Sequence, residues 1–542
     1  MDNNFHKKIE KLFKDKQFES IKFEIDLLDN DEKRDPYLYN ILGIIEATNK
    51  NNVGAIKYFS LAIELDKYYL NSLINLSKLS YIDKDFQNII TLLKNYHLKY
   101  PENDKVILTL ADLCFSAGYV EDTIYFHKKL IDKGNYQIND LSALIFLLNY
   151  SSKYSDKEYL EYCKLYDGIL EKNKTRYNIL NNEHDKTKIG FLSADFRDHS
   201  VGYFLKDFIK KLNEKNFKTI AFNLFKNNEN DLFTTELKNS FTQWHDVSEL
   251  NDKDLSDLIY SKRIYYLVDL AGYSTGNRLQ VFKNKPAPIQ LSWLGYCNET
   301  HINEIDYMIA DVNVIENKKN FNSDKIIKLP KIWNSLSKLD DVKTNELPFT
   351  KKNIFNFGCF NNFLKVSEDT IDIWSEILSK FKNSNLVLKS SVSADKGYKK
   401  YLVKKFKNRI DENRIIILNY EKDKKKHLEQ YLNIDLGLDT FPYNGVTTTF
   451  ESLWMGVPVI TLKGSKFVSR CGYSINKNAC LNEFTANTKE EYISIALNST
   501  TSGGIKILKK LRKDLRSKII KSPLFNVNDY TDEFVEQLKK IN

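Results

Sequence analysis

Two patterns of apolar residues divide the chain. Up to about Leu170 the apolar residues recur at the spacing of helices, and no strand-like alternation is present. The polar segment 172–186 follows, and its composition predicts a linker. From Thr187 onward, short apolar runs alternate with amphipathic segments, which predicts the strands and helices of a parallel α/β sheet. We therefore expect a helical domain over residues 1–171, joined by the linker to an α/β region.

The helical third contains a repeat. In a 34-residue unit that begins at Pro36, leucine and glycine occupy positions 7 and 8, alanine positions 20 and 27, and phenylalanine position 24. This spacing is typical of tetratricopeptide repeats, in which small residues let two helices approach closely. Stacked helix pairs form a concave surface that suits extended peptides, so a protein partner or protein substrate is expected. A non-repetitive helical bundle is the alternative. Further units are expected to begin at Leu70, Asp104 and about Ile138, with one helical pair before Pro36.

The α/β region contains two series of strands, so we expect two lobes, over 187–345 and 346–542, the second ending in a helix. A crevice between two such lobes suits an enzyme in which each lobe holds one substrate, and ligands of parallel sheets bind beyond the carboxyl ends of strands. Strands of the first lobe are predicted at Lys188–Ser193, Phe217–Phe225, Arg263–Leu270, Ile289–Gly295 and Asp306–Asp311. Strands of the second lobe are predicted at Asn353–Cys359, Asn385–Lys389, Arg414–Leu418, Ile434–Leu438 and Pro458–Leu462.

The stretch Ile434–Ser474 carries the clearest local chemistry. An apolar run ends at Asp439, a turn-rich segment follows, and the three threonines Thr447–Thr449 open an amphipathic segment that closes at Gly456. Strand, loop and helix in this order gather hydroxyls and unpaired backbone N–H groups where the helix begins, and such a helix start suits a phosphate. The alternative is an ordinary strand–helix–strand unit whose helix is capped by threonine.

Charge and cysteine usage narrow the class of protein. The 542-residue chain has a net charge of +9, from 81 basic and 72 acidic residues that are interleaved. Such a mixture does not supply the continuous basic face of a nucleic-acid-binding protein, and it is compatible with basic pockets for a phosphorylated ligand. The six cysteines form no C-x-x-C pair, so reduced thiols and a cytoplasmic location are expected. We expect neither a signal peptide nor a membrane span, because no apolar run is long enough.

Six segments, in order along the chain, match the motifs of one family. They are Ser193–Phe196 with His199, Val268–Tyr273 with Asn277 and Arg278, Pro286–Gln290 with Trp293–Tyr296, Phe360–Val366, Asn444–Pro458, and Ser522–Asn526 with Tyr530 and Thr531. The chain thereby resembles the O-linked N-acetylglucosaminyltransferase and SPINDLY glycosyltransferases of glycosyltransferase family 41, in which tetratricopeptide repeats also precede the catalytic region. The resemblance implies a GT-B fold, in which two Rossmann-like lobes hold the acceptor and the nucleotide sugar respectively.

The resemblance also implies donor-binding residues. Lys365 is similar to the family's lysine on the donor diphosphate, where a fixed cation offsets the charge that grows on the leaving nucleotide. An exposed lysine at a helix start is the alternative reading, and each of the other residues has a similar structural alternative. The other implied donor contacts are Thr447 and Thr448 on the diphosphate, Glu451 on the ribose hydroxyls, His427 near the nucleobase, and Asn362, Gly445 and Arg470 elsewhere in the cleft.

On the acceptor side, His199 corresponds to a histidine of the family. A neutral imidazole near pH 7 can accept the proton of a hydroxyl group as that group attacks the anomeric carbon. Whether His199 is the base or positions the acceptor stays open, and Asp195 and Asp269 are the rival proton acceptors. Together with Lys365, these residues form the expected catalytic set.

The implied reaction is an inverting transfer to serine or threonine hydroxyls of proteins, without a metal or other cofactor. UDP-N-acetylglucosamine is the expected donor. Val446 stands where the animal enzymes carry a histidine, and Thr447–Thr449 is closer to the SPINDLY branch, which includes enzymes that use GDP-fucose. Protein O-fucosylation is therefore one alternative, and a non-catalytic tetratricopeptide scaffold with a relict sugar-nucleotide domain is another.

Overall fold

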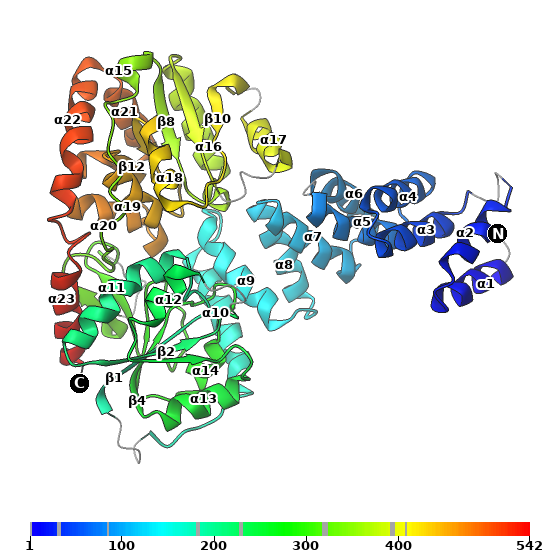
Figure 1. The fold of residues 1–542 in the computed structure, drawn as a ribbon, viewed down its shortest axis with the longest axis horizontal. Helices are drawn as coiled ribbons and strands as arrows, with labels where there is room; N and C mark the ends of the chain where they lie inside the picture. The colour runs from blue at the N-terminus through cyan, green and yellow to red at the C-terminus, as the bar shows by residue number, and fades with distance from the viewer. Residues whose placement is uncertain are drawn as a thin grey trace. The chain divides into compact units, whose positions relative to one another are not determined.

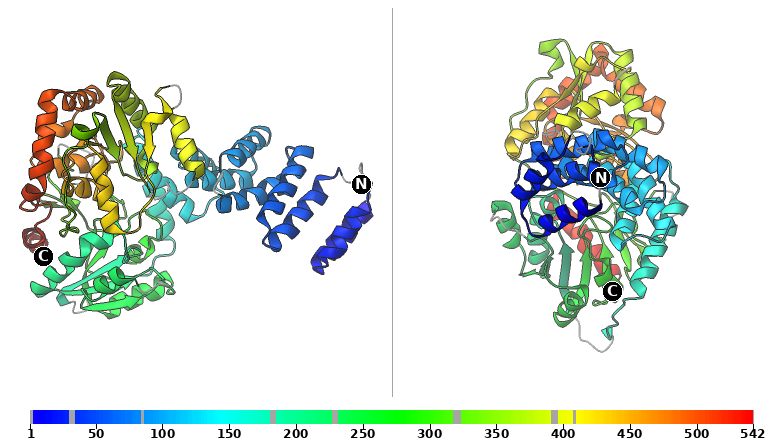
Figure 2. Two further views of the ribbon diagram at one scale, coloured as in Figure 1. Left: turned by 45° about the horizontal axis from the view of Figure 1, so that its top comes forward. Right: turned by 90° about the vertical axis from the view of Figure 1, so that its right-hand side faces the viewer.

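The computed structural model of the chain describes residues 3–29, 34–83, 86–179, 185–226, 231–316, 323–390, 396–406 and 409–541. The chain divides into two units, Met1–Tyr136 with Asp395–Leu402, and Gln137–Ala394 with Val403–Asn542. Figure 1 and Figure 2 show helices α1 to α8 of the first unit in shades of blue and the two sheets of the second unit in green to orange.

The first unit consists of helices that follow the predicted repeat. Consecutive helices pack against each other, and α3, α5 and α7 begin at Pro36, Leu70 and Asp104. The predicted repeat starts are therefore confirmed for this unit, as is the extra helical pair before Pro36. The helices are α1 (Asn3–Lys14), α2 (Phe18–Asp26), α3 (Pro36–Thr48), α4 (Asn52–Leu65), α5 (Leu70–Asp83), α6 (Phe86–Lys99), α7 (Asp104–Ser116) and α8 (Val120–Asp132).

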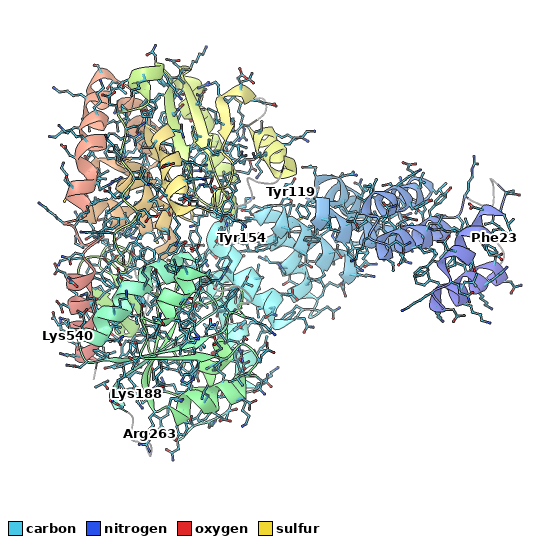
Figure 3. All side chains as sticks on the ribbon, in the orientation of Figure 1. Phe23, Tyr119, Tyr154, Lys188, Arg263 and Lys540 are labelled. Carbon is cyan, nitrogen blue, oxygen red and sulfur yellow. The ribbon has the colours of Figure 1, made fainter. Side chains whose placement is uncertain are left out.

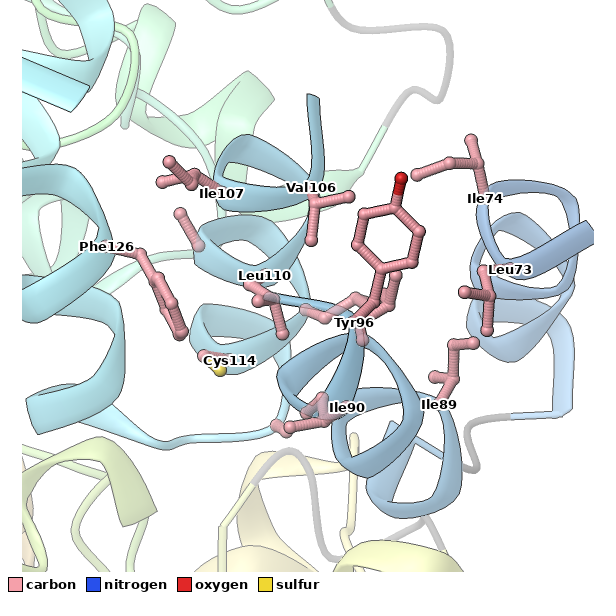
Figure 4. Packing of buried hydrophobic residues seen from close by; sticks show 14 of the residues in the cluster. Leu73, Ile74, Ile89, Ile90, Tyr96, Val106, Ile107, Leu110, Cys114 and Phe126 are labelled. Carbon is pink, nitrogen blue, oxygen red and sulfur yellow. The ribbon is translucent and has the colours of Figure 1, made fainter. Parts of the chain in front are cut away.

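Small residues at the repeat positions bring paired helices together. A Cβ atom on Gly43 would lie 2.5 Å from Cε1 of Phe59, so only glycine fits where α3 meets α4. Ala55 and Phe59 belong to one buried cluster. In the following pairs a larger cluster spans α5 to α8, with Leu73 and Phe126 at opposite ends of the view in Figure 4. The core of the unit thus continues from one helix pair to the next, as in other helical solenoids.

Two sheets with parallel strand pairs form the lobes of the second unit. The strand order is β3-β2-β1-β4-β5-β6-β7 in the first lobe and β10-β9-β8-β11-β12-β13 in the second. Both orders match that of Rossmann-like sheets, in which the strand order reverses at a switch point. The switch points lie between β1 and β4 and between β8 and β11. The strands are β1 (Asp185–Ser193), β2 (Lys218–Asn223), β3 (Gln243–Asp246), β4 (Ile264–Asp269), β5 (Ile289–Ser292), β6 (Tyr307–Asp311), β7 (Ile326–Leu329), β8 (Phe355–Cys359), β9 (Ser384–Leu388), β10 (Ile415–Ile417), β11 (Leu436–Leu438), β12 (Val459–Leu462) and β13 (Thr485–Ala486).

The direction of the strands brings their carboxyl ends toward the other lobe. Lys188 and Arg263 mark the amino ends of β1 and β4, and Figure 3 shows both at the edge of the first lobe that faces away from the second. The loops after β1 and β4 therefore open toward the second lobe. Strands β3, β7 and β13 were not predicted, because each is short and none carries a long apolar run.

Helices flank both sheets. They are α11 (Ser200–Glu214), α12 (Leu232–Lys238), α13 (Asp252–Ser261) and α14 (Leu279–Asn284) in the first lobe, and α15 (Phe349–Lys352), α16 (Glu368–Lys380), α17 (Lys396–Lys405), α18 (Lys424–Glu429), α19 (Thr447–Trp454), α20 (Cys471–Asn478), α21 (Lys489–Ser499) and α22 (Ser502–Ile519) in the rest of the chain. The amphipathic segment predicted after Thr447 is among them, as α19.

The last predicted repeat belongs to the second unit. It comprises α9 (Ile138–Leu147), the short helix η1 (Leu148–Tyr150) and α10 (Asp156–Glu171). The hydroxyl groups of Tyr159 and Tyr296 lie 2.8 Å apart, and the buried Lys283 lies 2.8 Å from Asp167 and 2.9 Å from Glu171. These contacts join α10 to the first lobe, so the units divide at residue 136 and not at the predicted linker, of which residues 180–184 lie outside the described residues.

The C-terminal helix α23 (Val527–Lys540) returns to the first lobe. It packs against α11, and Figure 1 shows it in red beside that lobe. The rings of Phe208 and Phe534 lie 4.9 Å apart, and those of Trp293 and Tyr530 6.4 Å apart. The sequence pattern predicts this helix in the second lobe, but its aromatic side chains pack against the first lobe.

Candidate active site

A cavity of about 620 Å³ lies between the two lobes, at the switch points of both sheets. In the first lobe it is lined by Asp195 and His199, which follow β1, and by Thr275, which follows β4. In the second lobe it is lined by Lys365, which follows β8, and by Thr448, which follows β11. Four loops from two sheets meet at one space, where parallel α/β sheets bind their ligands.

Lys365 belongs to the loop after β8 and reaches the loop after β11. Its Nζ donates to the carbonyl oxygen of Asn444 over 2.9 Å and lies 4.1 Å from the ring centre of Tyr443. Burial lowers the pKa of Lys365, and the nearby carboxylate of Asp439 opposes that shift. An ammonium group has three N–H donors, so Lys365 can bind Asn444 and an anionic ligand in the cavity at the same time.

The first turn of α19 provides a second element that suits a phosphate. Thr447 and Thr448 line the cavity, and Val446 occupies the N-cap position without a side-chain cap. First-turn N–H groups have no partner within a helix and carry partial positive charge. Gly445 is needed just before this turn, because a Cβ atom there would lie 2.5 Å from Oδ1 of Asn361.

A buried carboxylate fixes the loop that contains Gly445. Asp439 accepts hydrogen bonds from Gly445 N–H at 2.7 Å, from Asn361 Nδ2 at 3.0 Å and from the Thr461 hydroxyl at 2.9 Å. Asn361 Oδ1 in turn accepts from the hydroxyl of Thr448. Burial raises the pKa of Asp439 to about 6, against the effect of these hydrogen bonds. This network holds Thr448 at the cavity wall. In the sequence, the network is indicated by one feature, an aspartate directly after an apolar strand.

The first lobe contributes an imidazole and a carboxylate. His199 is the N-cap of α11, and its Nδ1 accepts the N–H of Val201 at 3.4 Å. Asp195 Oδ1 lies 3.6 Å from the same Nδ1 and 3.2 Å from Nη2 of Arg197. Burial lowers the pKa of His199, so its ring is neutral near pH 7. A neutral ring that accepts at Nδ1 carries its proton on Nε2, which makes His199 a hydrogen-bond donor in this arrangement and favours Asp195 as the proton acceptor.

A second cavity, of about 320 Å³, contains His427 and Glu451. His427 Nε2 lies 2.9 Å from Glu451 Oε2, and Lys389 Nζ lies 2.5 Å from His427 Nδ1. The Tyr431 hydroxyl donates to the same Oε2 over 3.0 Å. Burial lowers the pKa of Lys389 to about 8. The residues predicted near the nucleobase and the ribose are therefore joined in one hydrogen-bonded chain.

Lys424 connects the two lobes at this second cavity. Its Nζ lies 3.1 Å from Asp198 Oδ1 and 4.1 Å from the ring centre of Tyr203, both in the first lobe. Sequence reasoning did not single out Lys424, since it belongs to a basic run that reads as a solvated surface. Its ion pair depends on contact between lobes, which no local pattern indicates.

The architecture and this site agree with the comparisons to known proteins. The family model of glycosyl transferase family 41 matches residues 158–334 and 343–534.

The chain belongs to glycosyl transferase family 41.

Among curated relatives, a probable UDP-N-acetylglucosamine–peptide N-acetylglucosaminyltransferase SPINDLY of Hordeum vulgare is 31% identical over 350 residues, which cover 63% of this chain and 37% of that protein. The probable UDP-N-acetylglucosamine–peptide N-acetylglucosaminyltransferase SEC of Arabidopsis thaliana is 28% identical over 363 residues, 63% of this chain and 35% of that protein. The chain thus spans about two fifths of the length of these relatives. The family resemblance read from the motifs is confirmed.

A solved structure supports the architecture over nearly the whole chain. A mutant O-GlcNAc transferase from Thermobaculum terrenum is 22% identical, with a TM-score of 0.75, and the match covers 95% of this chain and 100% of that one. The predicted fold, helical repeats followed by a GT-B pair of Rossmann-like lobes, is confirmed. None of the helices in the described part of this family member combines the length and hydropathy that a membrane span requires.

Asp269 and Arg470 are predicted site residues that line neither cavity. Asp269 is 2% exposed, and its carboxylate accepts the N–H groups of Ala271 and Gly272. It holds the turn after β4, and burial raises its pKa to about 6. Arg470 donates to the carbonyl oxygen of Asn313 over 2.9 Å, with a second bond of 2.8 Å to Glu316. Arg470 therefore joins the second lobe to the first. It is not among the described residues that line the larger cavity.

The remaining predicted residues, apart from Gly445, line one of the two cavities. Asn362, Lys365, Thr447 and Thr448 line the larger cavity together with His199 and Asp195. His427 and Glu451 line the smaller one, whereas Gly445 lies behind the wall of the larger cavity and acts through backbone geometry. Sequence reasoning missed Asn334 and Arg197, which also line the larger cavity.

Proposed function

We propose that this chain is an inverting glycosyltransferase that moves a sugar from a nucleoside diphosphate to serine or threonine hydroxyls of proteins. The observation that carries the proposal is the 620 Å³ cavity, in which Lys365 and Thr448 of one lobe face the same space as His199 and Asp195 of the other. Membership of glycosyl transferase family 41 supports it.

The second lobe holds the leaving group. As the bond between sugar and diphosphate breaks, negative charge grows on the diphosphate, and donors that are already in place stabilise it. Lys365 supplies a fixed cation, and the first turn of α19 supplies N–H groups and the hydroxyls of Thr447 and Thr448. With these groups the charge is stabilised by the protein itself, and the proposed reaction is metal-independent and needs no other cofactor.

The first lobe activates the acceptor. The hydroxyl oxygen of the acceptor attacks the anomeric carbon and loses its proton, while the diphosphate leaves. Asp195 accepts that proton, and His199 holds the acceptor through Nε2–H, an assignment supported by the bond from Val201 to Nδ1 of His199. The helical repeats of the first unit hold an extended segment of the acceptor protein, as the concave surfaces of solenoids do.

UDP-N-acetylglucosamine is the donor that we propose. The names of the SPINDLY and SEC relatives contain this donor, which supports it. GDP-fucose is the second candidate, and Val446 with the triplet Thr447–Thr449 favours it. A non-catalytic scaffold is disfavoured by the intact set of Lys365, His199 and Asp195 at one cavity.

The same proposal includes a cytoplasmic location. All six cysteines are unpaired, and five of them are buried. Proteins of oxidising compartments usually pair their cysteines, so this pattern supports a reducing environment.

Transfer of label tests the proposal. The purified full chain is incubated with cell lysate and either labelled UDP-N-acetylglucosamine or labelled GDP-fucose. We expect label on protein from one of the two donors, released by β-elimination, and strongly reduced labelling with the Lys365→Met variant. No transfer from either donor by the folded wild-type chain would contradict the proposal.

A further inference from the structure

Asn334 is a buried amide in the wall of the larger cavity. It follows β7 in the segment that connects the two lobes, and it is 1% exposed. Neither Nδ2 nor Oδ1 has a hydrogen-bond partner among the residues that the structure describes. Asn334 is also among the residues that line the cavity, so a ligand that fills the cavity lies beside this residue.

The backbone around Asn334 is fixed from three directions. Trp333 N–H donates to Asp311 Oδ2 at 3.0 Å, and the Trp333 carbonyl oxygen accepts from Trp293 Nε1 and from the Tyr530 hydroxyl, each at 2.8 Å. On the other side, the Ser335 hydroxyl donates to the carbonyl oxygen of Leu524 over 3.1 Å. Both neighbours of Asn334 are buried, so the backbone at Asn334 is held inside the fold.

An amide in this state is costly unless something binds it. Buried polar groups in native proteins nearly always have partners, and one left unpaired lowers stability. Leucine has a similar shape and would remove that cost. An unpaired amide that is held rigidly at a cavity wall therefore indicates a ligand with a matching donor and acceptor.

The position of Asn334 in the cavity indicates which part of the donor it contacts. The same cavity is lined by Lys365 and Thr448, which suit the diphosphate, and by His199 and Asp195, which suit the acceptor hydroxyl. The transferred sugar has to stand between these two sets. Each hydroxyl group of the sugar can donate one hydrogen bond and accept two, whereas an ionised diphosphate can only accept hydrogen bonds.

We propose that Asn334 binds the hydroxyl groups of the transferred sugar. Nδ2 donates to one sugar oxygen, and Oδ1 accepts from a hydroxyl group of the same sugar. Asn334 is thus a specificity-determining residue that orients the sugar between leaving group and acceptor. This inference rests on the proposed glycosyltransferase function.

Binding of nucleotides with and without the sugar tests the proposal. Affinities of the full-length wild type and of Asn334→Leu are measured by calorimetry for UDP, UDP-N-acetylglucosamine, GDP and GDP-fucose. We expect Asn334→Leu to keep its affinity for the nucleoside diphosphate and to lose roughly 10-fold or more in affinity for the matching nucleotide sugar, the effect of about one to two hydrogen bonds.

Thermal stability without ligand provides a second readout. Asn334→Leu is expected to melt at the same temperature as the wild type or higher, because it removes an unpaired buried amide. Asn284→Leu is the matched control. Asn284 is equally buried, but Nδ2 bonds Ser256 and Oδ1 accepts from Thr175 and Gln280, so this change should lower the melting temperature and leave the ratio of the two affinities unchanged.

The outcomes separate this inference from the function on which it rests. If the wild type binds neither diphosphates nor nucleotide sugars, the proposed function fails and the inference fails with it. If the wild type binds a nucleotide sugar and Asn334→Leu binds it equally well, or loses affinity for diphosphate and nucleotide sugar alike, the inference is wrong and the proposed function stands. A marked loss of thermal stability in Asn334→Leu also overturns it, since the amide would then have partners within the fold.

Discussion

The Nζ of Lys365 lies 2.9 Å from the carbonyl oxygen of Asn444. This hydrogen bond joins the loop after β8 to the loop after β11, the two loops that diverge at the switch point of the second sheet. The cation is therefore fixed before any ligand binds, and it stands at the wall of the cavity together with Thr447 and Thr448. A fixed charge needs no reorganisation when the diphosphate leaves.

Replacing Lys365 by methionine should lower kcat by roughly 10²–10³-fold, the usual effect of removing one group that stabilises the transition state. Methionine keeps most of the volume over Tyr443, so the fold should be retained. Steady-state transfer of labelled sugar measures the effect. Lys382→Met, at an exposed position, is the control, and equal rates for the two variants would remove Lys365 from the mechanism.

Replacing His427 by alanine should weaken nucleoside diphosphate binding by roughly 10-fold, about 1.4 kcal/mol. The change breaks the chain that runs from Lys389 through His427 to Glu451. In the proposed mechanism these hydrogen-bonded residues bind the nucleotide and do not contact the reacting atoms. We therefore expect kcat at saturating donor to fall by a smaller factor than the affinity. Calorimetry with UDP and GDP measures the binding, and Lys425→Ala on the same helix serves as control. An unchanged affinity would exclude His427 from the nucleotide site.

The activity of the wild type should fall as the pH drops through the pKa of His199. Burial lowers that pKa below its ordinary value, so the ring is neutral at pH 7 and gains a proton only in more acidic solution. The protonated ring cannot accept the N–H of Val201 at Nδ1. The decline should therefore lie at a lower pH than the titration of an ordinary histidine.

The His199→Asn variant removes the titrating imidazole and should leave the fold intact. Asparagine is a good N-cap, so α11 should still begin at Ser200. Because His199 positions the acceptor, we expect kcat to fall by roughly 10²-fold and the acid decline of kcat/KM that is due to His199 to disappear. Should the variant keep the wild-type pH profile, another group is responsible for the decline.

The stability of the second unit should depend on pH through His301. Burial, with Lys164 and Lys325 nearby, lowers the pKa of His301 to about 4. Between about pH 6.5 and 4 the unfolded chain binds a proton that the folded chain does not, so stability is complete above that window and is lost as the pH falls through it. At pH 5 the loss should be about 2 kcal/mol relative to pH 7.

His301→Asn tests this assignment. His301 has a φ of 54°, and asparagine tolerates the left-handed region better than most residues. Urea unfolding at the two pH values, with fluorescence as the probe, gives the free energies. The variant should lose less stability between pH 7 and 5 than the wild type, and an equal loss in both proteins would contradict the prediction.

Replacing Gly43 by valine should impair protein glycosylation without affecting donor binding. The new side chain would collide with Phe59 between α3 and α4, and overpacking of this kind costs typically 1–3 kcal/mol. The repeats should lose protection in hydrogen exchange, and transfer to protein acceptors should fall. Affinity for the nucleotide sugar should stay as in the wild type. Gly134→Ala, where a Cβ atom meets nothing within 4 Å, is the comparison, although its φ of 73° adds local strain.

Much of the architecture follows from local patterns, and much of the site does not. The helices that begin at Pro36, Leu70 and Asp104 could be predicted because the repeat spacing is a local signal. The alternation of strands and helices is local as well. A motif places Asp269 near a strand end, but its side chain turned out to bond its own turn. The position of Asn334 depends on hydrogen bonds of its neighbour Trp333 to distant residues such as Tyr530, and no sequence pattern indicates them.

We expect the donor diphosphate to lie between Lys365 and the first turn of α19. A crystal structure of the full chain with UDP or GDP tests it most directly. The diphosphate oxygens should lie within hydrogen-bonding distance of Lys365 Nζ and of the hydroxyl or N–H groups of Thr447 and Thr448. A diphosphate bound elsewhere, with these groups unoccupied, would contradict it.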